Sequence, residues 1–314
     1  MREEYLWTEK FRPKSIQDII LPPEMIQSFQ SMVDHKEIPN LLLCGQPGSG
    51  KTTIAKALLE QLECDYLFIP ASLRGNIDTL RTEVTQFASS VSFSGKRKYI
   101  ILDEADYLNY TVQPALRNFM EEYSRNAGFI LTCNYKNRII PAIQSRCSTI
   151  EFNFSKDETN KLAAKFFKRV IKILEQENIK FDQKVLATYI QNFSQKGNLD
   201  FRKILHELQR YSVSGEIDAG ILSTKTETFN ELLSFMKAKD FTKVRTWIST
   251  EANNDTQTLL REFYDQASVH FTPSFIPELV TILADAQYTS AMVVDQEICL
   301  AAALVKVMVS AEWK

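Results

Sequence analysis

Several features are missing from this sequence, and each absence excludes a class of protein. The five cysteines, at positions 44, 64, 133, 147 and 299, form no C-x-x-C pair. Their scatter argues against a zinc site and a disulfide framework, and it favours a reducing compartment. The first residues do not resemble a signal peptide. The most apolar stretch, 298–309, is too short to span a bilayer and contains Lys306, so we expect no membrane segment.

An excess of positive charge is also absent. Lys and Arg number 37 and Asp and Glu number 39, which gives a formal net charge of −2. The chain is therefore no bulk nucleic-acid binder, and any DNA contact must come from local basic patches or from assembly. Its 314 residues are enough for two or three domains, and its 44% hydrophobic content is typical of a globular protein. We find no internal repeat and no low-complexity tail.

Residues 45–52 form a glycine-rich motif, Gly-Gln-Pro-Gly-Ser-Gly-Lys-Thr, that matches G-x-x-x-x-G-K-[ST]. An apolar run precedes it and a helical pattern follows, and this strand–loop–helix context argues against a chance match in a turn. Backbone amides there can surround a phosphate at a helix N-terminus. We expect Lys51 to bind the β- and γ-phosphates of ATP and the Thr52 hydroxyl to bind Mg²⁺. The expected ATP-binding residues of this segment are Gly45, Pro47, Gly48, Ser49, Gly50, Lys51, Thr52 and Thr53.

An acidic pair follows a second apolar run downstream. Residues 99–106 read Tyr-Ile-Ile-Leu-Asp-Glu-Ala-Asp, which is the Walker B pattern. Asp103 would hold Mg²⁺, directly or through water, and Glu104 would orient and deprotonate the attacking water. Loop starts are often acidic, but the position downstream of a phosphate loop favours the catalytic interpretation.

Two further side chains have both a catalytic and an ordinary interpretation. Asn134 ends the run 129–134 and would lie at the same sheet edge as Asp103, where its amide could hold the attacking water or sense the γ-phosphate; the alternative is an asparagine in a turn. Arg146 could act as an arginine finger, although surface arginines are common and spacing alone does not decide between them.

The arrangement of apolar runs predicts an α/β domain followed by helices. The runs lack period-two alternation, which is typical of parallel strands covered on both faces, and helical patterns separate them. After Phe154 the strand signals stop, and Ser155 begins a capping box that opens a helix to about Asn178. Further helices are expected near 182–194 and 199–213. The predicted strands are 41–44, 66–69, 99–102, 128–132 and 149–152.

The C-terminal part reads as a separate helical domain. Ser214 and Gly215 interrupt the pattern, and residues 216–314 are helical except near two prolines. We expect a last helix over about 289–312 that is apolar almost all round, so that either its own domain or neighbouring subunits must cover it.

Taken together, these motifs resemble the AAA+ ATPases and, within them, the sliding-clamp loaders, in particular replication factor C small subunits and the T-even-type phage large subunit. Residues 7–13, Trp-Thr-Glu-Lys-Phe-Arg-Pro, are similar to the family's N-terminal W-x-E-K-[YF]-R-P element. Residues 74–81 resemble its R-G-I-D-x-x-R stretch, with Asn76 as an extra residue. Residues 113–124 resemble its A-Q-x-A-L-R-R-x-M-E-x-Y-S helix, with Val112 in place of alanine. Residues 139–147, which end in Ser-Arg-Cys, complete the match. The resemblance is dense over 5–213 and faint beyond.

This resemblance implies an AAA+ P-loop NTPase domain with a five-stranded parallel sheet at 1–153, a three-helix lid at 154–215 and an all-α collar at 216–314. Five subunits would form an open spiral with ATP between them, and Arg146 would reach the neighbour's γ-phosphate. Arg202 matches the sensor-2 position of the lid. The N-terminal element would pack near the adenine through Glu9, Lys10, Phe11, Arg12 and Pro13.

The resemblance also implies the partners: a ring-shaped sliding clamp, primer-template DNA and other loader subunits. Arg74 and Arg81 would grip template phosphates without reading sequence. The segment Val91-Ser-Phe93 would insert into the clamp, although such residues more often fold back onto the core. The basic run 96–98 is more often a solvated loop than a DNA contact. The location would be the cytoplasm, that of the host for a phage protein, or the nucleus for a eukaryotic one.

Three functions agree with these features. The first is a DNA-dependent ATPase that loads the clamp, and the intact motifs favour it. The second is an assembly subunit that binds ATP with little turnover. The third is another AAA+ DNA-remodelling ATPase, which would usually carry a winged helix; 216–314 shows no strand pair or basic recognition helix. The sequence does not reveal which clamp or partner subunits are involved, or the position in the ring.

Overall fold

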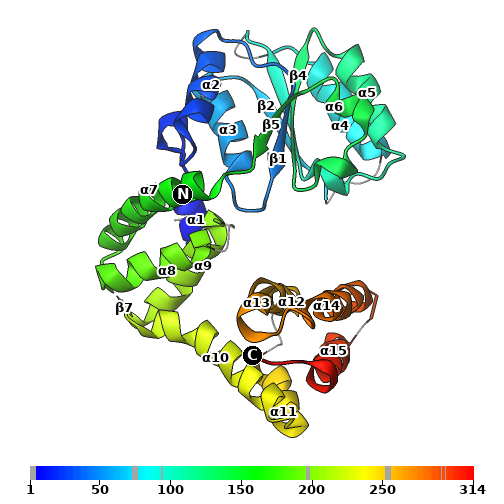
Figure 1. Ribbon diagram of the computed structural model, residues 1–314. Coiled ribbons are helices and arrows are strands. Elements are labelled where there is room, and N and C mark those ends of the chain that lie inside the picture. The colour runs from blue at the N-terminus through cyan, green and yellow to red at the C-terminus, as the bar shows by residue number, and fades with distance from the viewer. Residues whose placement is uncertain are drawn as a thin grey trace. The chain divides into compact units, whose positions relative to one another are not determined.

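The computed structural model describes residues 5–72, 77–92, 95–195, 199–251, 256–290, 292–293 and 295–314. It divides into two compact units, Met1–Asp218 and Ala219–Lys314, and each is described by itself (Figure 1). Among the helices in these ranges, none has the length and apolar character needed to cross a membrane.

The first unit is built on a five-stranded sheet. Its strands are β1 (Leu41–Gly45), β2 (Tyr66–Pro70), β3 (Lys98–Asp103), β4 (Ala127–Cys133) and β5 (Ser148–Phe152). They lie in the order β2-β3-β4-β1-β5, and every neighbouring pair is parallel. The predicted α/β fold with a five-stranded parallel sheet is therefore confirmed. Because all strands run the same way, their carboxyl ends meet at one edge.

Helices cover both faces of this sheet, which explains why the strands are apolar without alternation. Leu41 and Ile101 pack on the face covered by α2 (Pro23–Asp34) and α3 (Lys51–Gln61). Leu42 and Leu102 pack on the opposite face with α4 (Ile77–Ser89), α5 (Gln113–Glu122) and α6 (Pro141–Gln144). Figure 1 shows the two helical layers on either side of the sheet. Truncating one such leucine to alanine costs about 2–5 kcal/mol.

The remaining short elements of this part connect the strands and helices. An N-terminal helix, α1 (Trp7–Lys10), contacts a lid helix, and 3₁₀ turns lie at η1 (Ile16–Asp18), η2 (Ala105–Tyr107) and η3 (Lys136–Arg138). The η2 and η3 turns follow β3 and β4 directly, so they shape the sheet edge where the site lies.

Three helices form the lid: α7 (Lys156–Gln176), α8 (Gln183–Gln195) and α9 (Phe201–Tyr211), followed by the turn η4 (Ser212–Ser214). The predicted capping box is present, since Ser155 and Glu158 exchange hydrogen bonds. The expectation of no strand after Phe154 is wrong, because β6 (Lys180–Phe181) pairs with β7 (Glu216–Ile217). Two-residue strands leave no periodic pattern in a sequence.

The second unit is helical: α10 (Gly220–Lys237), α11 (Phe241–Glu251), α12 (Thr256–Asp265), α13 (Ala267–His270), α14 (Ile276–Ser290) and α15 (Gln296–Ser310). Aromatic rings fill its core, with Phe229 and Phe263 at 5.0 Å between centroids. The C-terminal Trp313 stacks on Phe271 at 4.7 Å and pairs with it through one isolated bridge.

The predicted last helix over about 289–312 is wrong at its start. Helix α14 ends at Ser290, and α15 begins at Gln296 because the Asp295 side chain accepts the backbone N–H groups of Glu297 and Ile298, at 3.0 and 3.2 Å. Among the residues that the structure describes, nothing covers Ile298 and Val309 of this helix, which are 68% and 75% exposed, so cover by the chain's own domain is incomplete there.

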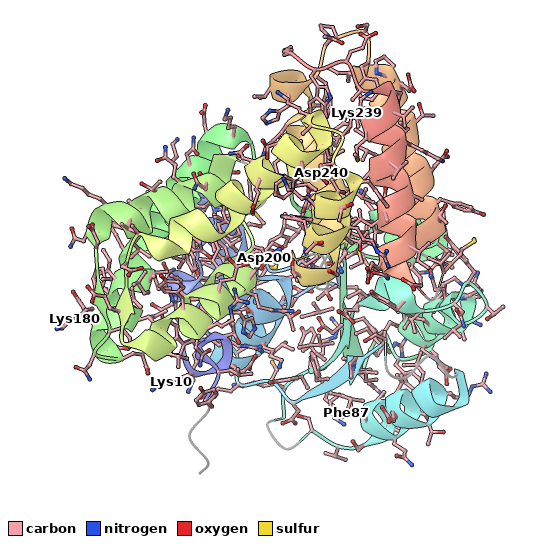
Figure 2. The ribbon with its side chains drawn as sticks, turned by 90° about the horizontal axis from the view of Figure 1, so that it is seen from below. Lys10, Phe87, Lys180, Asp200, Lys239 and Asp240 are labelled. Carbon is pink, nitrogen blue, oxygen red and sulfur yellow. The ribbon has the colours of Figure 1, made fainter. Side chains whose placement is uncertain are left out.

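The basic run 96–98 is a loop before a strand, as expected, only at residues 96 and 97, and Lys96 is exposed there; Lys98 is the first residue of β3. Lys98 is buried, and its ammonium donates to the Phe87 carbonyl at 2.7 Å and to Ser90 at the end of α4. Phe87 is labelled in Figure 2. Arg97 donates to the Ser124 carbonyl at 2.8 Å, and Lys96 donates to the Leu62 carbonyl at 2.9 Å. These cations therefore satisfy backbone carbonyls at the ends of α3 and α4 and in the turn after α5.

Candidate active site

The glycine-rich loop joins the buried strand β1 to α3, as the motif requires. Gly48 and Gly50 have φ of 71° and 95°, left-handed values that side chains rarely adopt. A methyl group at Gly48 would also lie 1.8 Å from Asp200 Oδ1, so the lid contacts the loop at this point. The Ser49 hydroxyl donates to the Gln46 carbonyl at 2.8 Å and closes the turn.

Lys51 is the first residue of α3, and its side chain is folded into the loop. It is 7% exposed, and its ammonium donates to the carbonyls of Gly45 and Gln46, both at 2.7 Å, and to Asn134 Oδ1 at 3.1 Å. Burial lowers the pKa of Lys51, and the Asp103 carboxylate opposes this shift. The three N–H groups of the ammonium thus donate to three protein oxygens, and phosphate oxygens of a bound nucleotide could take the places of these acceptors.

The carboxylate of Asp103, the last residue of β3, links the start of α3 to β4. Thr52 Oγ1 donates to Asp103 Oδ1 at 2.6 Å, and Thr132 Oγ1 donates to the same oxygen at 2.8 Å. Thr132 also accepts the backbone N–H of Glu104 at 3.0 Å. A hydroxyl beside a carboxylate is a donor set that suits Mg²⁺, which usually takes one or two protein oxygens together with phosphates.

Glu104 lies directly after β3 in a strained backbone conformation. Its φ is 56°, which costs about 1–2 kcal/mol for a residue with a side chain. The hydrogen bond from its N–H to Thr132 helps to hold this conformation. Glu104 lines the pocket beside the phosphate loop, as a general base would.

Asn134 is held from the opposite side by a buried acid. The N–H groups of Asn134 and Tyr135 both donate to Asp106 Oδ2 at 3.2 Å, and Asp106 is 5% exposed. The sequence motif contains Asp106 but gave no reason to assign it this role. Its position three residues after Asp103 places it on the η2 turn facing β4.

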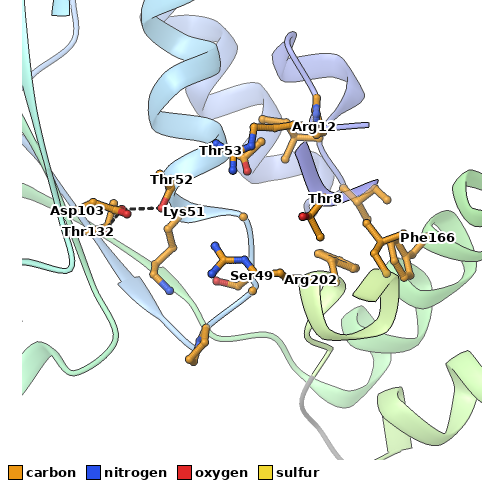
Figure 3. Close-up of a pocket in the computed structure, with 18 of the residues that line it drawn as sticks. Thr8, Arg12, Ser49, Lys51, Thr52, Thr53, Asp103, Thr132, Phe166 and Arg202 are labelled. Atoms are coloured by element: carbon orange, nitrogen blue, oxygen red, sulfur yellow. Dashed lines mark hydrogen bonds between the residues drawn. The ribbon is translucent and has the colours of Figure 1, made fainter. Parts of the chain in front are cut away.

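The other end of the pocket is apolar and joins the N-terminal segment to the lid (Figure 3). Arg169 on α7 ties these parts together, donating to the carbonyls of Asp18 at 2.6 Å and Phe11 at 2.9 Å. Burial lowers the pKa of Arg169. The rings of Phe166 and Phe201 lie 4.7 Å apart. The lining residues that sequence reasoning missed are Thr8, Ile19, Ile20, Thr132, Cys133, Phe166, Arg169, Phe201 and Leu205.

Most of the predicted nucleotide-binding residues line this one pocket. They are Phe11, Arg12, Pro13, Pro47, Gly48, Ser49, Gly50, Lys51, Thr52, Thr53, Asp103, Glu104, Asn134 and Arg202. Glu9 and Lys10 do not line it: Glu9 pairs with Arg12, and Lys10 pairs with Glu177 of the lid at 2.7 Å. Gly45 does not line it either and acts through its carbonyl on Lys51.

Arg202 reaches the pocket from the lid helix α9 (Figure 3). The helix begins at Phe201 because the side chain of Asp200, labelled in Figure 2, accepts the Lys203 N–H at 2.9 Å. The same carboxylate contacts Gly48, so the start of α9 is positioned against the phosphate loop.

The remaining predicted residues lie away from this pocket or outside the described ranges. Arg146 is on the surface after α6, where it donates to Glu121 through Nε at 2.8 Å and to the Ala142 carbonyl at 2.7 Å. Arg81 is exposed on α4, and Val91 is 89% exposed just after it. Arg74 and Phe93 lie outside the residues that the structure describes.

Comparisons with known proteins agree with this geometry. The family described as ATPase family associated with various cellular activities (AAA) matches residues 41–155. The sliding-clamp-loader large subunit AAA+ ATPase lid domain matches residues 158–223. A solved RuvB Holliday junction branch migration motor of Thermotoga maritima has a TM-score of 0.55 over 83% of this chain and 93% of that one, at 16% identity. That likeness shows the fold alone.

Curated relatives are more similar in sequence. The sliding-clamp-loader large subunit of Enterobacteria phage T4 is 32% identical over 99% of this chain and 98% of its own. That of Escherichia phage RB69 is 36% identical over 85% of each chain. The replication factor C small subunit of Sulfolobus acidocaldarius is 38% identical over 69% of this chain and 66% of its own. The chain therefore belongs to the sliding-clamp-loader family of AAA+ ATPases.

Proposed function

We propose that this chain is an ATP-hydrolysing subunit of a clamp loader, which opens a ring-shaped sliding clamp and loads it onto primer-template DNA during replication. The observation that carries the proposal is the hydrogen-bond network joining Lys51 to Asn134 and Thr52 to Asp103 at the carboxyl edge of the sheet. It brings side chains from the ends of two neighbouring strands, β3 and β4, to the first residues after the phosphate loop, with Glu104 beside them.

Each side chain of this network has a part in phosphoryl transfer. The Lys51 ammonium would exchange its oxygen partners for β- and γ-phosphate oxygens and neutralise their charge. Thr52 and Asp103 would hold Mg²⁺, which supplies Lewis-acid stabilisation of the phosphates when bound. Glu104 would accept the proton of the attacking water, and Asn134 would orient that water.

The apolar end of the pocket would hold the adenine. Phe11, Phe166 and Phe201 offer flat apolar surfaces there, and Thr8 adds a hydroxyl. Since these groups come from both the N-terminal segment and the lid, bound ATP would hold the two together. Arg202 would then place a positive charge near the phosphates from the lid side.

Arg146 would act on the ATP of a neighbouring subunit. It does not line the pocket of its own chain, and the ion pair with Glu121 holds it at the surface after α6. Such a position suits an arginine finger supplied in trans in an assembly of five subunits. We propose that Arg146 exchanges Glu121 for the γ-phosphate when subunits meet.

The contacts with DNA and the clamp follow from the family resemblance. Arg74 and Arg81 would bind template phosphates, and the exposed position of Arg81 on α4 supports this. Val91 and Phe93 would contact the clamp, and the exposure of Val91 leaves it available for such a contact.

The experiment that tests the proposal measures ATP hydrolysis by the assembled loader, with and without primed DNA and the cognate clamp. We expect turnover to rise when both are present. If ATP binds but turnover stays at background under every condition, the chain is an ATP-binding assembly subunit. If DNA alone gives full stimulation and the clamp has no effect, the chain is another kind of DNA-remodelling ATPase.

A further inference from the structure

Two thiols lie in contact directly behind the active site. Cys44 on β1 and Cys133 on β4 are register partners on adjacent parallel strands. Their Sγ atoms are 3.1 Å apart, and the residues are 4% and 1% exposed. Both side chains belong to the core on the same face of the sheet. The proposed phosphoryl-transfer chemistry uses neither of them.

The backbone geometry around this pair permits a disulfide bond. Neighbouring strands lie about 4.7–4.9 Å apart, within the range of about 4.4–6.8 Å between Cα atoms that disulfides span. The sulfurs would have to approach by about 1 Å to reach a bond of about 2.05 Å. Rotation of the two side chains and a shift of the strand ends can both supply this approach, and the proposed switch uses the second.

The residues next to the two thiols hold the catalytic lysine. Gly45 follows Cys44, and its carbonyl accepts the Lys51 ammonium at 2.7 Å. Asn134 follows Cys133, and its Oδ1 accepts the same ammonium at 3.1 Å. A movement of either strand end would thus change the position of a partner of Lys51.

The pair also has a route to solvent. Cys133 lines the nucleotide pocket, whereas Cys44 lies behind it. Cys133 is only 1% exposed, so we infer that a small oxidant reaches the pair from the pocket that Cys133 lines, and that a bound nucleotide closes this route.

We propose that Cys44 and Cys133 form a reversible disulfide when a hydroperoxide enters the nucleotide-free pocket, and that this bond switches the ATP site off. The loss of turnover rests on the proposed function, whereas formation of the bond does not.

The chemistry is a two-electron oxidation. One sulfur attacks a peroxide oxygen and becomes a sulfenic acid, and the other oxygen leaves as water when hydrogen peroxide is the oxidant. The second sulfur then attacks the sulfenic sulfur, forms the S–S bond and releases a second water. The two thiols lose two protons and two electrons, and the peroxide is reduced. The hydrogen bond between the two thiols lowers the pKa of Cys44, against the effect of burial, and raises the pKa of Cys133, so Cys44 is the better nucleophile of the pair and suits the attack on the sulfenic sulfur.

The test treats the full chain with hydrogen peroxide, blocks the remaining thiols and maps disulfides by peptide mass spectrometry. We expect a Cys44–Cys133 link that dithiothreitol reverses, and MgATP should slow its formation several-fold. A chain that acquires only sulfinic acid at Cys133, or no link, would overturn the proposal. Equal rates with and without MgATP would overturn the pocket route.

Nucleotide binding and turnover are measured on the same samples, each variant against its own reduced form. Turnover of the oxidised chain should fall by roughly a hundredfold, the effect of displacing a reacting group by about 1 Å. Cys44→Ala should form no internal link and should lose far less activity on the same treatment. If Cys44→Ala is inactivated as strongly as the natural chain, the switch is not this disulfide. If the reduced chain has no turnover, the proposed function is contradicted. Disulfide mapping would still show whether the Cys44–Cys133 bond forms.

Discussion

The hydroxyl of Thr132 connects both acidic residues of the Walker B motif: it donates to Asp103 Oδ1 at 2.8 Å and accepts the Glu104 N–H at 3.0 Å. Thr132 is 2% exposed and lies on β4, the strand next to that of the acidic pair. One side chain thus sets the direction of the Asp103 carboxylate and supports the strained backbone of Glu104. Thr132 therefore acts on the site by holding Asp103 and Glu104 in place.

Thr132→Val should separate this positioning from binding. The change keeps the shape but removes the hydrogen bond to Asp103 and leaves the half-buried Glu104 N–H without its acceptor, which costs about 1 kcal/mol of stability. We expect turnover to fall by at least about tenfold while ATP affinity changes little, since Lys51 keeps its partners. Thr132→Ser is the matched control, because it retains the hydroxyl. Steady-state kinetics and equilibrium nucleotide binding measure the two effects, and normal turnover in Thr132→Val would contradict the role.

Glu104→Gln and Lys51→Ala should differ in which step they impair. Glu104→Gln keeps Asp103 for Mg²⁺ and removes the base, so we expect retained ATP affinity and turnover reduced by roughly a hundredfold or more. Lys51→Ala removes the charge that faces the phosphates, so ATP binding itself should weaken. Filter binding and single-turnover hydrolysis distinguish these outcomes. Turnover near that of the natural chain in Glu104→Gln would assign the base to another residue.

Arg146→Ala should leave ATP binding by the isolated subunit unchanged and reduce stimulated hydrolysis in the assembly by roughly a thousandfold. Its exposed pair with Glu121 is worth only about 0–1 kcal/mol, so the fold should tolerate the change. Glu121→Gln is the matched control: it breaks the pair but keeps the arginine, and hydrolysis should not fall.

The same variant also tests whether Arg146 acts in trans. Mixing Arg146→Ala with Lys51→Ala subunits should restore some activity, at interfaces that combine an intact pocket with an intact finger. Normal hydrolysis by an assembly made only of Arg146→Ala subunits would mean that another residue is the finger.

Replacing Arg74 and Arg81 with alanine should weaken primer-template binding evenly across sequences. Each arginine that contacts a phosphate displaces about one counterion, so the slope of log affinity against log salt should decrease by up to about two charge equivalents. Basal ATP hydrolysis without DNA should persist, which serves as the control for folding. Binding titrations at several salt concentrations measure the slope, and an unchanged slope would place the DNA contacts elsewhere.

Tyr189 should make lid stability depend on alkaline pH. Burial, and then the Glu207 carboxylate that its hydroxyl contacts at 2.5 Å, raise the pKa of Tyr189 in the folded state. In the unfolded chain the phenol ionises near pH 10, so its contribution is fully present below about pH 10 and is lost as the pH rises above that value. Thermal unfolding across this range should show the loss in the natural chain and a smaller one in Tyr189→Phe. If the stability of both chains falls equally as the pH rises, Tyr189 is not the group responsible.

Sequence reasoning located the five strands of the large sheet within one residue at each end, because buried parallel strands are continuous apolar runs bounded by polar turns. The phosphate loop and the acidic pair were found for a similar reason, since their residues are adjacent in the chain. The predicted start of the last helix was wrong, because the side chain of Asp295 caps the helix and begins it at Gln296. The prediction that Lys98 is solvated was also wrong, because nothing in the local sequence shows that the end of α4 will cover a lysine at the start of β3.

The sequence by itself determined which chemistry is available: a phosphate loop, an acid pair, an asparagine and two arginines, each recognisable from its local motif. Only the tertiary structure decided that Thr132 joins Asp103 to Glu104, that Asp106 holds the start of the Asn134 turn, and that Arg169 ties the lid to the N-terminal segment. It also brought Cys44 and Cys133 together. These contacts join residues far apart in the chain, and their partners depend on strand order and register, which no local pattern of side chains records.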